Sequence, residues 1–176
     1  MYKNLKIIAQ QHNMSEDELG YYITGFVEGE GNFNLYIRNR KKQKGIQVHP
    51  RFCVVQTDIE PMRMIKDCLG CGGISIKKQH TGRERTCYAL QVGGKRDCYL
   101  KIIPFFDKYG FTTKRKQEEY RIWKEGVCFI QKSHLTKEDI EKVDRIIKRK
   151  RGVKYIVDIA NKRISNVPVR LDTYTD

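Results

Sequence analysis

The stretch Ile-Thr-Gly-Phe-Val-Glu-Gly-Glu-Gly, residues 23–31, places small residues inside a predicted helix and two carboxylates at its C-terminal end. Gly25 and Gly29 are one helical turn apart, a spacing that lets two helix backbones approach closely. If two copies of the chain pair through this helix, both copies of Glu28 and of Glu30 converge on one small volume. Carboxylates crowded at a helix C-terminus, where the helix dipole disfavours negative charge, are explained by bound divalent cations. The alternative is that both acids are solvated beyond a frayed helix end.

The residues around this stretch predict where the helix begins and ends. Ser15 and Glu18 have the spacing of a capping box and come directly before an apolar run over residues 19–27. Gly29 and Gly31 predict the end of the helix, because glycine adopts positive φ at little cost and has poor helix propensity.

The residues that follow predict two strands, a helix and two more strands. From Asn32 to Arg40 apolar and polar residues alternate strictly, as in a half-buried strand. A second strand is predicted over 47–55, in which Pro50 indicates an edge position or a local break. Helical spacing returns over 58–69. Two further strands are predicted over 74–79 and 86–92, and helices over 97–109, 114–125 and 137–149, the last with Thr136 as its cap. The segment from Gly152 is left unassigned.

Length and composition indicate one domain and a polyanionic partner. A chain of 176 residues that is 39% hydrophobic fills one core, so we expect a single domain, with its centre at about 15–126 and a C-terminal helical extension at about 133–176. Lys and Arg number 35 against 21 Asp and Glu, a formal charge of +14. Because the basic residues interleave with Tyr, Phe, Asn and Gln in the predicted strands, nucleic acid is favoured over a generically basic protein. Each element occurs once, so an enzyme that needs two copies must dimerise.

No stretch has the pattern of a signal peptide or a membrane span, so we expect no membrane partner and a location inside a cell or organelle. The six cysteines lack the regular spacing of a secreted disulfide framework, which predicts reduced thiols. Cys68 and Cys71 have the spacing of half a zinc site, but neither the other cysteines nor a histidine completes it. A zinc-dependent nucleic-acid module therefore ranks behind the alternatives below.

Residues 23–31 resemble the LAGLIDADG motif in its common Gly-Phe-x-Glu-Gly-Glu-Gly form, with the glycines and both acidic positions in register. Over residues 19–125 the predicted order of elements is similar to that of the single-motif, homodimeric LAGLIDADG homing endonucleases. The resemblance implies an α+β fold of order αββαββα, with a concave four-stranded antiparallel sheet and additional C-terminal helices. It also implies an intron-encoded enzyme that cuts both strands of a long pseudo-palindromic DNA site and leaves short 3′ overhangs. The implied cofactor is Mg²⁺ or another divalent cation, such as Mn²⁺, or Ca²⁺ in complexes that do not cleave.

By the same resemblance, the last acid of the motif, Glu30, holds the metal together with Gly29, while Glu28 is structural. The face of the helix that meets the second copy would carry the dimer-interface residues Tyr21, Thr24, Gly25 and Glu28.

Two further catalytic residues are implied by the resemblance. Gln56, at the end of the second strand, would order water near the metals. It shares the parity of Phe52 and Val54, so it reaches the centre only if the strand ends or twists there, and a surface glutamine is the alternative. Lys114 would stabilise charge on the phosphorane or polarise a water. Lys116 is its substitute, and a plain phosphate contact by either lysine is the competing interpretation.

The polar face of the sheet would lie along the major groove, where Arg pairs with guanine and Asn or Gln with adenine. The candidate DNA contacts are the polar side chains of the strands and their turns: Asn34, Tyr36, Arg38, Arg40, Gln47, His49, Arg51, Lys77, Arg83, Arg85 and Gln91. The basic run over 148–151 would add sequence-independent affinity or be a solvated helix end.

Two alternatives share this fold. An RNA maturase, with intron RNA as its partner, would not need the central acid Glu30. A DNA-binding regulator that does not cleave would keep the basic sheet face but could lose Glu30, Gln56 and Lys114 together, and the presence of all three favours the enzyme. The expected compartment is a prokaryotic cytoplasm, a mitochondrion or a chloroplast.

Overall fold

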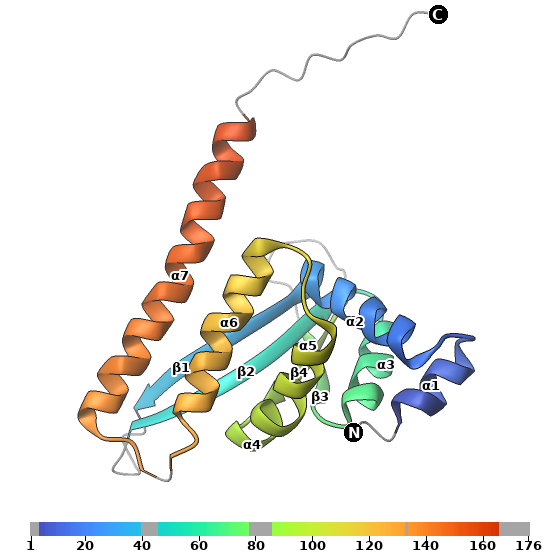
Figure 1. The fold of residues 1–176 in the computed structure, drawn as a ribbon, viewed down its shortest axis with the longest axis horizontal. Helices are drawn as coiled ribbons and strands as arrows, with labels where there is room; N and C mark the ends of the chain where they lie inside the picture. Colours follow the sequence, from blue (N-terminus) through green and yellow to red (C-terminus); the bar gives the residue numbers. More distant parts are fainter. Residues whose placement is uncertain (1–3, 40–45, 78–85, 133, 166–176) are drawn as a thin grey trace, which may run out of the picture.

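The computed structural model describes residues 4–39, 46–77, 86–132 and 134–165 (Figure 1). The elements of this described part, in chain order, are α1 (Leu5–Gln11), α2 (Glu16–Glu30), β1 (Gly31–Asn39), β2 (Ile46–Gln56), α3 (Glu60–Leu69), β3 (Gly73–Lys77), β4 (Cys87–Gly93), α4 (Lys95–Asp97), the π-helical turn η1 (Cys98–Ile102), α5 (Ile103–Tyr109), α6 (Lys114–Phe129) and α7 (Lys137–Ser165). The predicted α+β order is confirmed. None of the helices in the described ranges has the length and apolar character of a membrane span.

Helix α2 begins and ends where the sequence predicts, but its end does not use the predicted positive φ. The Ser15 hydroxyl accepts a hydrogen bond from the Glu18 N–H at 3.2 Å, and the Glu18 carboxylate accepts one from the Ser15 N–H at 2.7 Å. At the other end Gly31 has φ −84° and ψ 152°, so the chain passes directly into β1 without a residue at positive φ. Space is what requires glycine here, because a Cβ would lie 2.5 Å from Val27 Cγ1 and 2.6 Å from the Val27 carbonyl oxygen.

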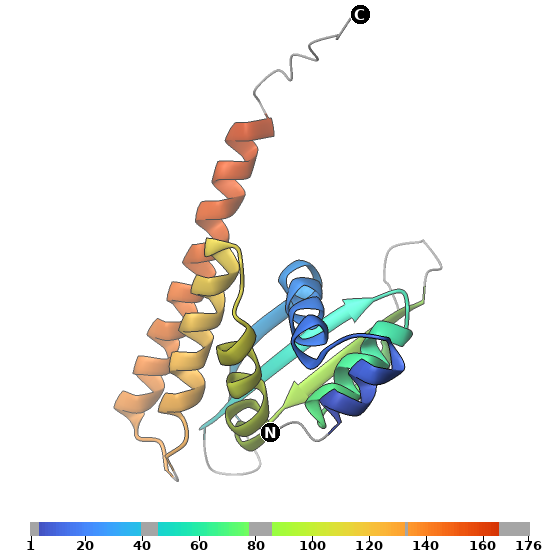
Figure 2. The ribbon, with the colours of Figure 1, turned by 45° about the vertical axis from the view of Figure 1, so that its right-hand side comes forward.

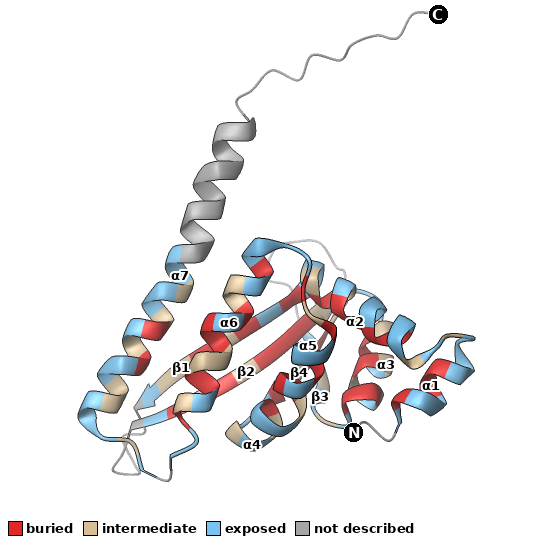
Figure 3. Ribbon diagram, in the orientation of Figure 1, coloured by how far each residue is buried: buried red, intermediate tan, exposed pale blue. Residues whose placement is uncertain are grey.

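In the described part four strands form an antiparallel sheet in the order β1-β2-β4-β3. Phe33 pairs with Phe52 and Val54 pairs with Leu90, so large apolar side chains share one face of the sheet. These residues are fully buried under the helices, which lie across one face of the sheet (Figure 2). Buried residues also run along α2, α5 and α6 (Figure 3). The polar residues that alternate with them point to the opposite face, which we call the open face.

Pro50 lies in β2, which is an internal strand of the sheet. At Pro50, however, β2 has a neighbouring strand on one side only. Pro50 is opposite Leu35 of β1, and pairing with β4 begins one residue later, at Arg51 opposite Gly93. The missing N–H of Pro50 therefore does not interrupt the β2–β4 ladder. The strand is not at the edge of the sheet, and only its residues up to Pro50 lack a β4 partner.

Aromatic rings fix α5 and α6 over the sheet. The ring centroid of Phe33 lies 5.0 Å from that of Trp123, 5.3 Å from Phe52 and 5.5 Å from Phe106. The Trp123 indole N–H also donates to the Asn34 carbonyl at 3.0 Å, which covers part of the exposed edge of β1. The position of α6 relative to β1 is thus set by both packing and hydrogen bonding.

Three helical segments extend the prediction. Helix α1, which the sequence pattern did not predict, buries Leu5, Ile8 and Ala9 and contacts α2 and α3. The helical run that includes α5 starts at Lys95 and contains a π-helical turn. Helix α7 has the predicted Thr136 cap, runs beside α6 and continues through Gly152 (Figure 1).

Gly31→Ala should lower the free energy of unfolding by roughly 1–3 kcal/mol, because the added Cβ overlaps Val27 in the preceding turn. Urea denaturation followed by circular dichroism measures the change. Gly73→Ala is the matched control, since a Cβ at Gly73 meets no atom within 4 Å, and its effect should be within about 0.5 kcal/mol. An equal loss in both variants would contradict the steric role of Gly31.

Candidate functional site

The C-terminal end of α2 presents oxygen donors to solvent. Glu30 is exposed, and its carboxylate makes no hydrogen bond or ion pair with any residue in the described ranges. Gly29, also exposed, belongs to the last turn of the helix, where backbone carbonyls have no partner within the helix. A free carboxylate beside such a carbonyl has the chemistry that Mg²⁺ or Ca²⁺ prefers.

The carboxylate of Glu28, two residues earlier, is bound by backbone groups of its own subunit. It accepts hydrogen bonds from the N–H of Thr112, at 3.2 Å, and from the N–H of Thr113, the residue that precedes α6. Burial alone would raise the pKa of Glu28, but the hydrogen bonds from Thr113 and Thr112 and the charge of Lys116 outweigh it, so the pKa is lowered. The structure thus gives Glu28 a structural role, in which it fastens the end of α2 to the start of α6.

This contact places Lys114 at the same end of the fold as Glu30. Lys114 is the first residue of α6, directly after Thr113, and it is exposed. Lys116 differs, because it is 2% exposed and its ammonium donates to the Gly31 carbonyl at 2.7 Å and pairs with Glu119 at 3.1 Å. The expectation that Lys116 could substitute for Lys114 is therefore wrong.

Gln56 reaches the same edge of the sheet through the strand register. Gly31, the first residue of β1, is opposite Val54, so Gln56 lies two residues beyond the start of β1, on the side of α2. Its side-chain oxygen accepts hydrogen bonds from the N–H of Thr57, at 2.7 Å, and from the Thr57 hydroxyl, at 3.0 Å. The amide nitrogen remains as the group that could bind a water.

The open face carries the candidate DNA contacts that the structure describes: Asn34, Tyr36, Arg38, Gln47, His49, Arg51, Lys77 and Gln91. Arg40, Arg83 and Arg85 lie outside the described residues. Arg51 is central in this set. Its guanidinium stacks 4.7 Å from the centre of the Tyr36 ring and donates to the Tyr36 hydroxyl and, at 3.2 Å, to the Gln91 side-chain oxygen.

The outer face of α2 leaves space beside its glycines. A Cβ at Gly25 or Gly29 would meet no atom within 4 Å, and Tyr21 is 60% exposed. Thr24 is not on this face: it is 4% exposed, and its hydroxyl donates to the Gly20 carbonyl at 3.0 Å. The predicted interface role of Thr24 is therefore wrong, because the side chain packs into the core of its own subunit.

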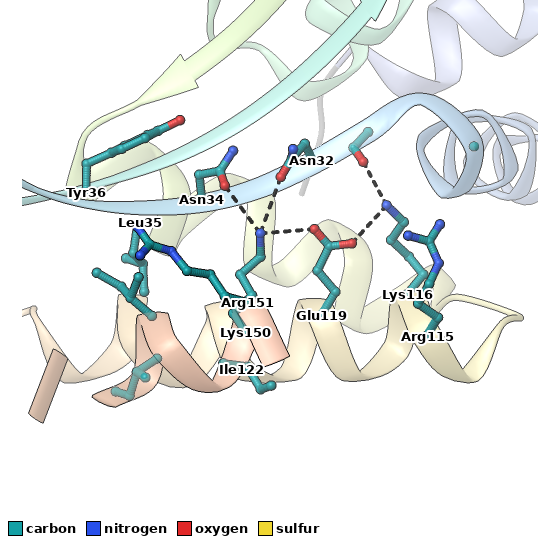
Figure 4. Close-up of a pocket in the computed structure, with 14 residues that line it drawn as sticks. Asn32, Asn34, Leu35, Tyr36, Arg115, Lys116, Glu119, Ile122, Lys150 and Arg151 are labelled. Atoms are coloured by element: carbon teal, nitrogen blue, oxygen red, sulfur yellow. Dashed lines mark hydrogen bonds and ion pairs between the residues drawn. The ribbon is translucent and has the colours of Figure 1, made fainter. Parts of the chain in front are cut away.

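A polar network that the sequence did not predict lies beside Gly29, in a cavity of about 320 Å³ between β1, α6 and α7 (Figure 4). The Lys150 ammonium lies 3.3 Å from the side-chain oxygens of both Asn32 and Asn34 and 3.1 Å from the Glu119 carboxylate. Burial would raise the pKa of Glu119, but Lys150 and Lys116 lower it by their charge. No spacing rule could have found this network, because Lys150 is more than a hundred residues from both asparagines.

The described residues offer no zinc site. Nowhere in that part of the chain do three His, Cys, Asp or Glu side chains come close enough to hold a metal ion. The six cysteines are unpaired, as expected for reduced thiols.

Comparison with known proteins assigns the family. A family model described as LAGLIDADG endonuclease matches residues 23–127, which is more than half of the chain. The chain belongs to the LAGLIDADG endonuclease family. A probable intron-encoded endonuclease of Neurospora crassa is 31% identical over 74% of this chain and 24% of its own length. A second from the same fungus is 31% identical over 70% of this chain and 25% of its own. The chain thus spans about a quarter of these LAGLIDADG relatives.

Solved LAGLIDADG structures share the fold. An archaeal intron-encoded homing endonuclease in complex with DNA superposes with a TM-score of 0.67 and 25% identity, over 79% of this chain and 86% of that one. I-SmaMI bound to an uncleaved DNA target in the presence of calcium ions gives a TM-score of 0.62 and 28% identity, over 73% of this chain and 43% of that one.

Glu28→Gln should lower the free energy of unfolding at neutral pH by about 1 kcal/mol, because a neutral amide replaces a carboxylate that accepts two backbone hydrogen bonds. The folded-state pKa of Glu28 lies below its ordinary value of 4.5, so this stabilisation is complete above pH 4.5 and is lost as the pH falls through the folded-state pKa. Urea denaturation at several pH values from about 7 down to about 3 measures it.

Glu30→Gln is the matched control, with the same change in the same motif at a carboxylate free of hydrogen bonds to described residues. At neutral pH it should not reproduce the loss seen in Glu28→Gln, because it removes no hydrogen bond to a described residue. A gap between the two variants that stays constant down to the lowest pH would show that Glu28 does not act through its charge.

Proposed function

We propose that this LAGLIDADG family member is a homing endonuclease, in which two copies pair through α2 and make a site-specific double-strand break in a long pseudo-palindromic DNA. The observation that carries the proposal is the free carboxylate of Glu30, at the end of a helix whose outer face is kept clear by glycines. We take residues 1–176 as one domain, with α7 as an extension of the family fold.

The glycines on the outer face of α2 have no packing role within one subunit, and this supports pairing through α2. Gly25 lies in the middle of α2, away from positive φ, with open space where a Cβ would be. Glycine there destabilises a helix by about 1 kcal/mol relative to alanine, and no contact of the subunit offsets it. Close approach of a second α2 would use that space, and a two-fold axis through it would bring both Glu30 carboxylates together.

The residues at this end of the fold fit a divalent cation, with Mg²⁺ as the expected ion. Glu30 and the Gly29 carbonyl of each copy would hold it, since both supply oxygen donors and neither is committed within the described structure. When bound, the cation would neutralise charge on the attacked phosphate and favour ionisation of water. The I-SmaMI complex with calcium and uncleaved DNA supports metal binding in this family.

Two further side chains would act on the reacting groups. Lys114 projects from the first turn of α6, where its cation can stabilise the extra negative charge of a pentavalent phosphate. The Gln56 amide nitrogen, left free by the hydrogen bonds of Thr57 to its oxygen, can donate to the attacking water and orient it.

The open face would bind the two half-sites of the DNA. It presents Arg38, Arg51 and Lys77 with several amides, and relatives of the same fold are solved with DNA. A two-fold symmetric protein pairs with a pseudo-palindromic target. By resemblance to the family, we infer cuts across the central minor groove that leave short 3′ overhangs. The names of the relatives favour an intron-encoded protein that acts within a cell or organelle.

In vitro selection of cleaved sites from a randomised DNA library with Mg²⁺ should recover one long pseudo-palindrome. Glu30→Gln should cut that site at least about 100-fold more slowly, because the metal loses its carboxylate ligand, while binding it with Ca²⁺ as wild type does. Glu141→Gln, an exposed acid on α7, is the charge-matched control and should cut normally. If wild type binds DNA without cutting it, the proposal of an enzyme is replaced by that of a DNA-binding regulator. If it binds structured RNA without cutting DNA, the proposal is replaced by that of an RNA maturase.

Gly25→Leu should shift the chain from dimer to monomer, because a leucine fills the space that a second α2 would occupy. Light scattering after size exclusion measures the mass over a range of protein concentrations. Glu141→Leu places the same side chain on an exposed face of α7 and should leave the dimer intact. A wild-type chain that stays monomeric at all concentrations and on DNA would refute pairing through α2.

A further inference from the structure

The side-chain amides at the β1 edge of the open face have a fixed orientation. Lys150 of α7 lies between Asn32 and Asn34 and contacts the oxygen of each (Figure 4). An ammonium group has three N–H donors and no acceptor, so the amide atom that faces it must be the oxygen. The nitrogen of each amide therefore points away from α7.

The same polarity recurs in the middle of the sheet. Arg51 donates to the side-chain oxygen of Gln91 at 3.2 Å, and guanidinium also lacks an acceptor. The Tyr36 hydroxyl oxygen accepts from Arg51 as well, which leaves its proton to point outward. None of the strand residues in the described ranges is Asp or Glu. The open face thus presents hydrogen-bond donors and few acceptors.

Glu119 keeps Lys150 in this position. One carboxylate oxygen of Glu119 is 3.1 Å from Lys150, and the other is 3.1 Å from the buried Lys116. The Lys150 side chain is 16% exposed, so its ammonium is held between α6 and α7 and is not free to move in solvent. Lys150 also lies outside residues 23–127, the part matched by the family model.

We propose that Lys150 is a positioning residue for base recognition, which holds Asn32 and Asn34 with their nitrogens toward the DNA and so selects base edges that offer acceptors. The proposal rests on the proposed function, because it takes the open face as the surface that meets the major groove. For Asn34, it would replace the general expectation that Asn pairs with adenine.

The chemistry of the groove gives the direction of the preference. Asparagine recognises adenine through two bonds, in which its nitrogen donates to N7 and its oxygen accepts from the N6 amino group. With the oxygen held by Lys150, the second bond is lost and the N6 donor faces another donor. Guanine offers acceptors at N7 and O6 and thymine offers O4, so these bases are favoured at the contacted positions.

The test compares base preferences among wild type, Lys150→Met and Lys148→Met in parallel selections of DNA sites. Lys148 is the matched control, because it loses the same charge from the same basic run, while its side chain is 71% exposed and pairs with Asp144 on α7. The positions that the amide contacts are found independently, as those where Asn34→Ala alone loses its base preference.

At those positions wild type and Lys148→Met should both prefer guanine or thymine over adenine. Lys150→Met frees the amide oxygens and should raise the relative recovery of adenine there by on the order of tenfold. Asn34→Asp keeps an oxygen toward Lys150 but has no N–H, so it should lose the preference for guanine even if Lys150→Met folds poorly.

Two results overturn the proposal. One is that wild type selects adenine at the DNA positions contacted by Asn34. The other is that wild type, Lys148→Met and Lys150→Met all show the same base preference at those positions. Failure of wild type to select any DNA site would instead refute the proposed function, and this inference with it. The outcomes are distinguishable, because the first two require a recovered target and the third yields none.

Discussion

The hydrogen bonds from the Thr112 and Thr113 backbone to the Glu28 carboxylate are the constraint on which the candidate site depends. They join the last turn of α2 to the two residues that directly precede α6, more than eighty residues further along the chain. Glu30 follows on one side of this junction and Lys114 on the other. A carboxylate can accept two N–H groups where an amide accepts with one oxygen, so the acid at position 28 is explained without any role in chemistry.

Helix α2 has a buried face and an exposed face, and Gly31 connects the helix directly to β1. One face buries Leu19, Ile23 and Val27 where α2 packs on α1, α5 and the sheet, while the other leaves open space at Gly25 and Gly29. Because Gly31 lets the helix enter β1 without a loop, the strand register follows from the end of the helix. That register places Gln56 level with the motif, so a single helix end positions each group of the proposed active site.

Local signals in the sequence predicted local structure well. The capping box at Ser15 and the strict alternation in β1 are short-range patterns, and the structure confirms both. The roles of Thr24 and Lys116 were wrong because a linear motif does not show which side of a helix faces its own core. The contact of Lys150 with Asn34 is set by how α7 packs against the β1 edge, and 116 residues of chain separate the two.

The basic excess of the chain has two parts with different physical consequences. Lys116 and Lys150 are held around Glu119 and the β1 edge, where they neutralise a partly buried carboxylate and satisfy backbone or amide oxygens. Lys114 is exposed and can release counterions when a phosphate binds. The formal charge of +14 therefore overstates the number of phosphate contacts. In the proposed complex, part of that charge would instead fix which atoms the open face offers to DNA, and would act on the choice of sequence rather than on affinity for any polyanion.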